Sequence, residues 1–197
     1  MNYLAHLLLA QPNADSYFGN LLGDFRKGVQ VRDFDLAVRR GLHNHQVVDK
    51  FTDTHQEVME AKSYFHKTRR RFAPVALDMY FDHLLIKHWH RFSGLSFERF
   101  CHDSYARLQQ RMHLMPPLMQ QRVGHMISHH WFAEYAKEQG ITDAITNVAK
   151  RIRFKNTFHY IVDDIAKHHA QLEIHFLRFF PELQGYVNKH GPENTAL

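Results

Sequence analysis

Apolar residues recur three or four positions apart along nearly the whole chain, which is the spacing of one face of an α-helix. Strict alternation of apolar and polar residues is scarce, and β-branched residues form only short clusters, so strands are not expected. Asn2, Pro74 and Pro117 are suited to helix starts, and Gly140 to a helix end. The predicted helices cover residues 3–10, 33–53, 56–70, 74–91, 96–114, 117–139, 142–153 and 158–180.

Glycines interrupt the pattern after the first predicted helix. Gly19, Gly23 and Gly28 have the spacing of neither a Walker loop nor a dinucleotide fingerprint, which excludes those two nucleotide-binding sites. Asn20 and Asp24 lie one helical turn apart in this stretch. Taken alone, they are predicted to be capping or turn residues.

Length and composition indicate a single folded domain. The 197 residues are 44% hydrophobic and 23% charged, and they include 16 Phe, 8 Tyr and 2 Trp, which excludes a disordered chain. No internal repeat, low-complexity tract or linker divides the sequence. We therefore predict one compact all-α domain over residues 1–197.

The charge balance is moderately basic. Lys and Arg outnumber Asp and Glu by 25 to 20, which gives a formal net charge of +5. This excess favours an acidic partner, namely nucleic acid, anionic lipid, a phosphorylated molecule or an acidic protein, without selecting one of them. Basic runs at residues 62–71 and 150–155 are typical of a solvated helix face, and the alternative is a docking surface.

Cysteine content and hydropathy define the expected compartment. Cys101 is the only cysteine, so no internal disulfide can form, and a reducing cytoplasm is predicted. The apolar run at residues 7–9 has no basic segment before it and ends at Gln11, which is unlike a signal peptide. No segment approaches the length of a membrane span.

Several of the 18 histidines stand close to aspartates at helical spacing. In a helix over residues 41–56, His45, Asp49 and Asp53 share one side, whereas His43 points about 160° away from His45. Histidine and aspartate are the usual ligands of hydrolytic metal ions. We expect His45 and Asp49 to face one ion if this side lines a cleft, and the alternative is an ordinary polar helix face.

Carboxylates also flank an apolar stripe in the helix predicted over residues 74–91. Asp78 and Asp82 lie at the edge of that stripe, where a carboxylate must be hydrogen-bonded, ion-paired or bound to a cation. His83 is about 100° from Asp82, so the two share an ion only if it lies between them. His6 interrupts an apolar run and is predicted on its own to be a core histidine.

Four motifs, taken together and in this order, resemble those of the acyl carrier protein phosphodiesterases. They are Met-Asn-Tyr-Leu-Ala-His-Leu at residues 1–7, Gly-Asn-Leu-Leu-Gly-Asp-Phe at 19–25, Gly-Leu-His-Asn-His-Gln-Val-Val-Asp-Lys-Phe-Thr-Asp at 41–53 and Leu-Asp-Met-Tyr-Phe-Asp-His-Leu at 77–84. Each motif alone is weak, but four in register are specific. The resemblance implies an all-helical, HD-domain-like fold, as in the metal phosphohydrolases of that class.

The resemblance also implies an activity, which is removal of the 4′-phosphopantetheine arm from holo-acyl carrier protein by a hydrolase that usually uses manganese. The adjacent pair of ordinary HD enzymes is His-Asp, whereas here Asp82 precedes His83. The ligands are therefore taken from this family's own motifs. The expected ligands of one or two divalent ions, most simply Mn²⁺, are Asp24, His45, Asp49 and Asp82.

Further roles follow from the same resemblance. His83 or His6 is expected to protonate the leaving serine oxygen of the carrier. Asn20 is expected to hold the attacking water or a phosphate oxygen. Asp53 and Asp78 are expected to orient the metal ligands.

Acyl carrier proteins are strongly acidic, so a basic face of this chain is expected to bind one. The residues expected to form it are Arg26, Lys27, Arg69, Arg70 and Arg71. Lys27 is also suited to offset charge on the phosphate. Neither nucleic acid nor a membrane is an expected partner.

Two other functions remain as alternatives. An HD-type phosphohydrolase acting on a nucleotide or another small phosphodiester would share the metal site but would need no docking face. A basic helical module for nucleic acid would bind no metal, and its affinity would fall steeply with salt.

Overall fold

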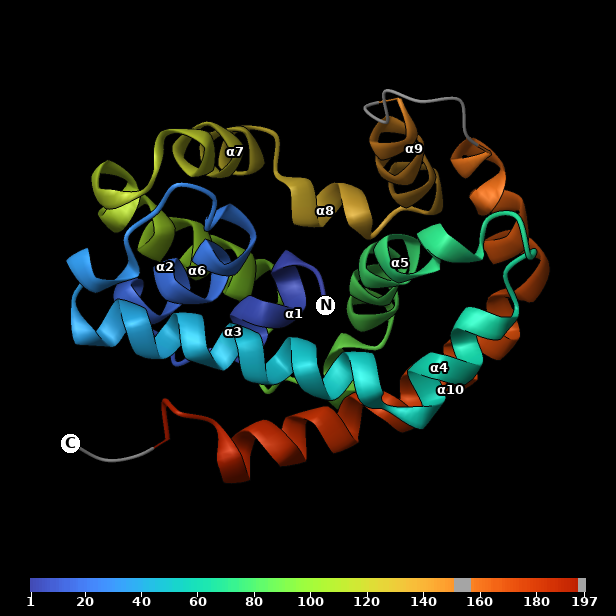
Figure 1. Ribbon diagram of the computed structural model, residues 1–197, viewed down its shortest axis with the longest axis horizontal. Helices are drawn as coiled ribbons and strands as arrows, with labels where there is room; N and C mark the ends of the chain where they lie inside the picture. The colour runs from blue at the N-terminus through green and yellow to red at the C-terminus, as the bar shows by residue number, and fades with distance from the viewer. Residues whose placement is uncertain (151–156, 195–197) are drawn as a thin grey trace.

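The computed structural model describes residues 1–150 and 157–194, and no strand occurs in these two ranges. The all-α prediction is therefore confirmed (Figure 1). The α-helices are α1 (Tyr3–Leu8), α2 (Ala14–Leu22), α3 (Leu36–Thr54), α4 (Gln56–Ser63), α5 (Ala73–Lys87), α6 (Phe97–Arg111), α7 (Pro117–Ser128), α8 (Trp131–Tyr135), α9 (Glu138–Ala149) and α10 (Ile161–His190). The 3-10 turns are η1 (Gly23–Phe25), η2 (Val31–Asp33), η3 (Arg70–Phe72), η4 (Trp89–Arg91), η5 (Met112–Leu114) and η6 (Phe158–Tyr160).

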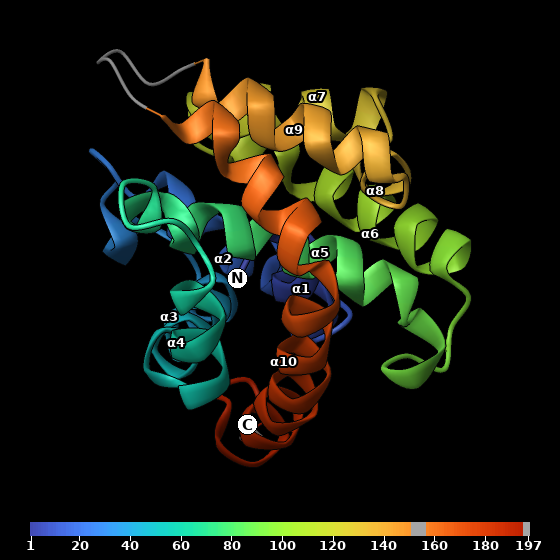
Figure 2. The same cartoon turned by 90° about the vertical axis from the view of Figure 1, so that its right-hand side faces the viewer.

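Helices lie in two groups around α1 and α5 (Figures 1 and 2). α7, α8 and α9 form a row on one side, α3 and α4 lie on the other, and the long α10 begins beside α9 and runs across to the side of α3 and α4. The buried core joins α5 to α10 through aromatic rings, among them Phe81, Phe176 and Phe179, all of which are almost fully buried. This apolar packing supplies most of the driving force for the fold.

Several predicted boundaries were wrong, each for a local reason. The glycine-containing stretch forms α2, because Gly19 lies where α2 packs closely on α3 rather than where a helix ends. The helix predicted over 117–139 is broken at His130, which adopts a left-handed φ of 48°. Residues 151–153, which form the predicted end of the helix over 142–153, lie outside the described residues.

Among the described residues, no helix combines the length and the apolar character that a membrane span requires.

The first helix is capped from another part of the chain. Asn2 is at the N-cap position of α1, but its side chain makes no capping hydrogen bond, contrary to expectation. The Asp82 carboxylate, on α5, accepts from the backbone N–H of Leu4 at 3.0 Å and of Ala5 at 3.1 Å. Two of the free donors at the helix start are thereby satisfied.

Asp82 is fully buried, which agrees with the expectation that a carboxylate beside the core is hydrogen-bonded. Burial raises the pKa of Asp82 to about 7, while the two N–H donors act in the opposite direction. The two hydrogen bonds therefore stabilise the ionised form of the buried carboxylate, and they also stabilise the start of α1.

Replacing Asp82 with Ala is expected to lower the free energy of unfolding by about 1–3 kcal/mol, because two buried N–H groups lose their acceptor. Urea unfolding followed by circular dichroism measures this. Asp33→Ala is the matched control, because that side chain is exposed in η2 and makes only a long contact with Arg32. Equal midpoints for the two variants would show that the cap contributes little.

Candidate metal centre and adjoining cleft

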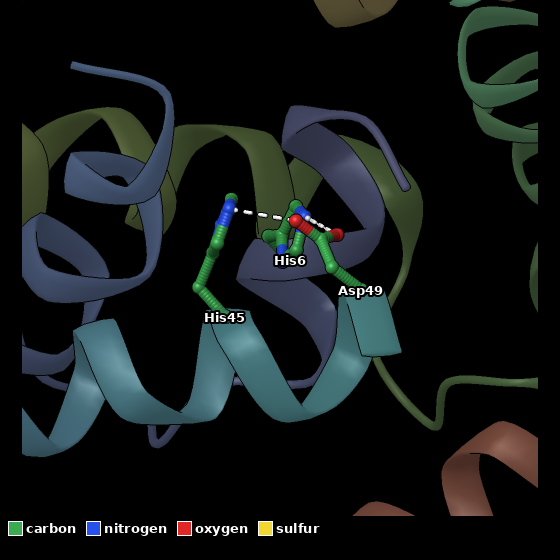
Figure 3. A group of neighbouring side chains, drawn as sticks. All are labelled: His6, His45 and Asp49. Carbon is green, nitrogen blue, oxygen red and sulfur yellow. Dashed lines mark ion pairs between the residues drawn. The ribbon is translucent and has the colours of Figure 1, made fainter. Parts of the chain in front are cut away.

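Two predicted metal ligands, His45 and Asp49, meet His6, which was expected instead to be a proton donor, at one point between two helices (Figure 3). On α3, His45 Nε2 lies 2.9 Å from Asp49 Oδ2, as the four-residue spacing predicted. On α1, His6 Nε2 lies 3.2 Å from Asp49 Oδ1. The two imidazoles stack at a centroid distance of 4.0 Å. One ligand atom from each of the three side chains lies within 4.8 Å of the others, so the group could hold a metal ion.

Glycines bring α2 close enough to α3 to build this group. A Cβ on Gly19 would overlap the backbone carbonyl of Val38, and a Cβ on Gly41 would lie 2.7 Å from the carbonyl of Ser16. A Cβ on Gly23 would overlap the imidazole of His45. The glycines of the second and third motifs are therefore required by close packing.

The backbone of Asn20 fixes the orientation of His45. His45 Nδ1 donates to the Asn20 carbonyl at 2.7 Å, so in the neutral ring the Nε2 lone pair points at the Asp49 carboxylate. Such an arrangement requires a proton or a cation between the two groups. Burial lowers the pKa of His45, but the hydrogen bond to Asp49 and its charge outweigh burial, and the pKa is raised.

His6 has a different electrostatic environment. Burial, together with the neighbouring His45, lowers the pKa of His6 to about 3, so its ring is neutral. Its Nδ1 is buried and has no hydrogen-bond partner in the part of the chain that the structure describes. Burial would raise the pKa of Asp49, but hydrogen bonds from His45 and His6 lower it, so this carboxylate is ionised. Neutral imidazole beside ionised carboxylate is a suitable donor set for a divalent metal.

Further carboxylates surround the buried ammonium group of Met1. This nitrogen lies 3.3 Å from Asp49 Oδ1 and 3.2 Å from Asp78 Oδ1. Burial opposes the charge on the ammonium, but Asp78 and Asp49 outweigh burial and raise its pKa. Desolvation by surrounding protein atoms, together with Asp49 and Asp78, raises the pKa of Asp24. Negative charge is therefore concentrated here, which a divalent cation would offset.

Other predicted site residues lie elsewhere or contact the site indirectly. Asp82 caps α1, with both oxygens occupied by backbone N–H donors. His83 Nδ1 donates to the Tyr135 carbonyl on α8 at 2.8 Å, so this ring is turned toward α8. The Asn20 side chain is buried in a network with Ser16, Asn44 and Glu193, and only its carbonyl contacts His45.

Asp53 is exposed at the end of α3, where it pairs with Lys62 at 3.6 Å, and it contacts none of the three clustered side chains. A second group able to hold a metal, Glu57, Glu60 and His175, joins α4 to α10. Sequence reasoning missed this group, because nothing in the local spacing relates His175 to a helix more than a hundred residues earlier.

The predicted basic residues differ in their surroundings. Arg26 and Lys27 are exposed and directly follow the η1 turn that carries Asp24. Arg69 forms a two-pronged pair with Asp164, at 2.8 Å and 2.7 Å, so its charge is already balanced. Arg70 and Arg71 are exposed in η3. Most of the second basic run lies outside the described residues.

A cleft of about 680 Å³ adjoins the carboxylates, with Asp24 and Asp78 among its lining residues. One wall is formed by the first residues of the chain, η1 and the start of α5, and the other by α7, α8 and α9. Tyr3 stacks on Phe25 and on Trp131, both at 6.4 Å. Sequence reasoning missed this cleft, because its walls come from segments far apart in the chain.

Gly23→Ala is expected to displace His45 from Asp49 and to weaken Mn²⁺ binding by about 10- to 100-fold, the range for loss of a ligand-orienting contact. Isothermal titration with Mn²⁺ measures the affinity, and circular dichroism checks the fold. Gly185→Ala is the control, because a Cβ there meets nothing within 4 Å. Unchanged Mn²⁺ affinity in Gly23→Ala would contradict a role for His45 in binding the metal.

Comparison with known proteins points to one family. The family described as "Acyl carrier protein phosphodiesterase" matches residues 1–183. A protein of that name from Serratia proteamaculans is 33% identical over 184 residues, covering 93% of this chain and 95% of the relative. No solved structure gives a significant match, so the HD-like aspect of the fold stays a prediction.

Two more relatives carry the same name. The protein from Photorhabdus laumondii is 31% identical over 182 residues, covering 92% of each chain. The protein from Escherichia coli O157:H7 is 33% identical over 193 residues, covering 96% of this chain and 98% of the relative. The similarity therefore extends over nearly the full length of both partners in each comparison.

Proposed function

The chain belongs to the acyl carrier protein phosphodiesterase family, and we propose that it hydrolyses the phosphodiester between the 4′-phosphopantetheine arm and a serine of holo-acyl carrier protein. The products are the apo-carrier and free phosphopantetheine. One observation carries this proposal, which is that all four motifs contribute to one small region: His6, the Asn20 carbonyl, the His45–Asp49 pair and Asp78. Motifs that merely packed a core would have no reason to gather carboxylates and imidazoles together.

A divalent metal is the cofactor we propose for this region, with manganese as the first candidate. His6, His45 and Asp49 would hold it, and Asp24 and Asp78 add carboxylates close by. Such a metal supplies an activated water near neutral pH and offsets charge on the phosphate. The buried setting of His6 and His45 keeps competing water away from these imidazoles.

Two residues act through others in this proposal. Asp82 positions α1, and with it His6, because both of its oxygens are already used as hydrogen-bond acceptors. The Asn20 carbonyl orients His45 so that Nε2 faces Asp49. The low pKa of His6, about 3, favours a role as a neutral ligand over a role as proton donor.

His45→Ala and Asp49→Asn are each expected to slow hydrolysis of holo-acyl carrier protein by at least about 100-fold, because each removes a side chain that would bind the metal. Mass spectrometry of the carrier follows loss of the arm, with Mn²⁺ and with chelator. His43→Ala is the control, since His43 is an exposed histidine on the same helix.

Two results would contradict parts of this proposal. Activity that persists in chelator would contradict the proposed dependence on a metal. A holo-carrier left intact by a protein that binds Mn²⁺ would instead favour a small phosphodiester as the substrate.

A basic surface next to the site is proposed to bind the acidic carrier. Lys27 and Arg26 are the best placed of the predicted cations, because they are exposed and directly follow the η1 turn that carries Asp24. Arg69 is less suited to this role, since it is paired with Asp164. Positive charge here would speed encounter with an acidic protein and orient it.

Lys27→Glu is expected to raise KM for the holo-carrier about tenfold at low salt and to reduce the dependence of KM on salt. Steady-state kinetics at several salt concentrations measure both. Lys189→Glu makes the same charge change in the last turn of α10, a helix that contributes no residue to the lining of the cleft, and it is expected to behave as wild type. Equal KM values for the two variants would show that Lys27 does not contribute to binding the carrier.

A further inference from the structure

We propose that the cleft between the first residues of the chain and helices α7 to α9 binds the pantetheine portion of the arm, with Tyr3 and Trp131 as its aromatic wall. This inference rests on the proposed function, because the arm is the substrate named there. It adds the part of the protein that recognises the arm, as distinct from the part that acts on the phosphate.

Position is the first argument. Asp78 lines the cleft and also contacts the Met1 ammonium at 3.2 Å, and that ammonium contacts Asp49. Asp24 lines the cleft as well, and its pKa responds to His45 and Asp49, so it is close to both. The cleft therefore opens beside the candidate metal centre. A phosphodiester held among these carboxylates would have the cleft directly available for its attached arm.

The size of the cleft is the second argument. Its volume of about 680 Å³ lies within the range of about 300–1,000 Å³ that is usual for sites of small organic molecules. Val75, Leu118 and Val148 provide apolar surface, and Asn147 and Asp143 provide polar groups in the same cleft.

This mixed lining suits pantetheine better than a hydrocarbon chain. The pantetheine portion of the arm is an uncharged, flexible chain with two amides, a secondary hydroxyl, a geminal dimethyl group and a terminal thiol. Its amides need hydrogen-bonding partners when they leave water, and Asn147, Asp143 and Arg122 can supply them. A hydrocarbon ligand would instead desolvate these polar groups without compensation.

The aromatic wall is the third argument. The rings of Tyr3 and Phe25 are 16° from parallel, and those of Tyr3 and Trp131 are 19° from parallel, so three aromatic side chains cluster where the two walls of the cleft meet. The Arg122 guanidinium lies 6.0 Å from the Trp131 ring, at the edge of this surface. Sites of small organic molecules usually combine aromatic and apolar side chains with a few polar groups, and the lining of this cleft has both.

A strained corner directs Trp131 into the cleft. His130 precedes it with a left-handed φ of 48°, a conformation that residues with a Cβ adopt infrequently. Phe132, the residue after Trp131, holds this turn in place. It is buried, its ring stacks on Tyr105 at a centroid distance of 5.4 Å, and its N–H donates to the Tyr105 hydroxyl. The fold thus maintains an unfavourable backbone conformation at the residue that turns the chain toward the cleft.

The test uses pantetheine itself, which lacks the phosphate and so reports on the cleft alone. Titration of pantetheine into the full-length protein, followed by calorimetry, is expected to show binding, and pantetheine is expected to inhibit hydrolysis of the holo-carrier competitively. Leu118→Trp, at an exposed position in the cleft, is expected to abolish this binding and to raise KM for the holo-carrier about tenfold. Asn147→Trp, a second exposed lining position, is expected to act in the same way.

Leu114→Trp is the matched control, because Leu114 is another exposed leucine just before α7 but does not line the cleft. It is expected to bind pantetheine and cleave the holo-carrier as wild type does. Mn²⁺ affinity is expected to stay unchanged in all three variants, because none of these three residues belongs to the candidate metal centre.

Different outcomes separate this inference from the proposed function. If the wild type cleaves the holo-carrier, but pantetheine neither binds nor competes, or both cleft variants match Leu114→Trp, the inference is overturned while the function stands. If the wild type leaves the holo-carrier intact, the proposed function fails. In that case, pantetheine binding that is lost in Leu118→Trp would still support the cleft as its site, and no binding would overturn both.

Discussion

The contact between the Asp82 carboxylate and the first turn of α1 is the constraint on which the site depends. A fully buried carboxylate is costly unless donors surround it, and the N–H groups of Leu4 and Ala5 provide them. This contact fixes the start of the chain against α5. Both the Met1 ammonium and His6 then reach Asp49 from the same short segment. The two hydrogen bonds that stabilise the start of α1 therefore also determine the geometry of the candidate metal centre.

Close approach of helices makes a second, related contribution. Gly19 and Gly41 let the backbones of α2 and α3 approach within a distance that any side chain would prevent, and Gly23 leaves room for the His45 ring. The carbonyl of Asn20 comes within hydrogen-bonding distance of His45 only because of this approach. The three glycines therefore matter because they lack a side chain, and none of them has a positive φ.

Local periodicity was sufficient for part of this picture. The helical class and the His45–Asp49 pair follow from spacing along one helix, since residues four apart share a face. Asp82 was expected to bind metal, but its partners lie 77 and 78 positions away, which no local pattern reveals. The same limit applies to His83, which contacts Tyr135, and to the Tyr3–Trp131 stack. α2 was missed because glycines that serve packing look like helix breakers.

The two walls of the cleft come from different parts of the chain. The candidate metal centre and the neighbouring Asp24 and Asp78 belong to the first 84 residues, whereas Trp131, Arg122 and Asn147 belong to the separate row formed by α7, α8 and α9 (Figure 1). Exposed positions in that row, such as Leu118, can change without disturbing the packing around His45. In the proposed function, ligand preference and bond cleavage would therefore rest on different parts of the chain, so a laboratory library restricted to α7, α8 and α9 is expected to alter selectivity while leaving the candidate metal centre unchanged.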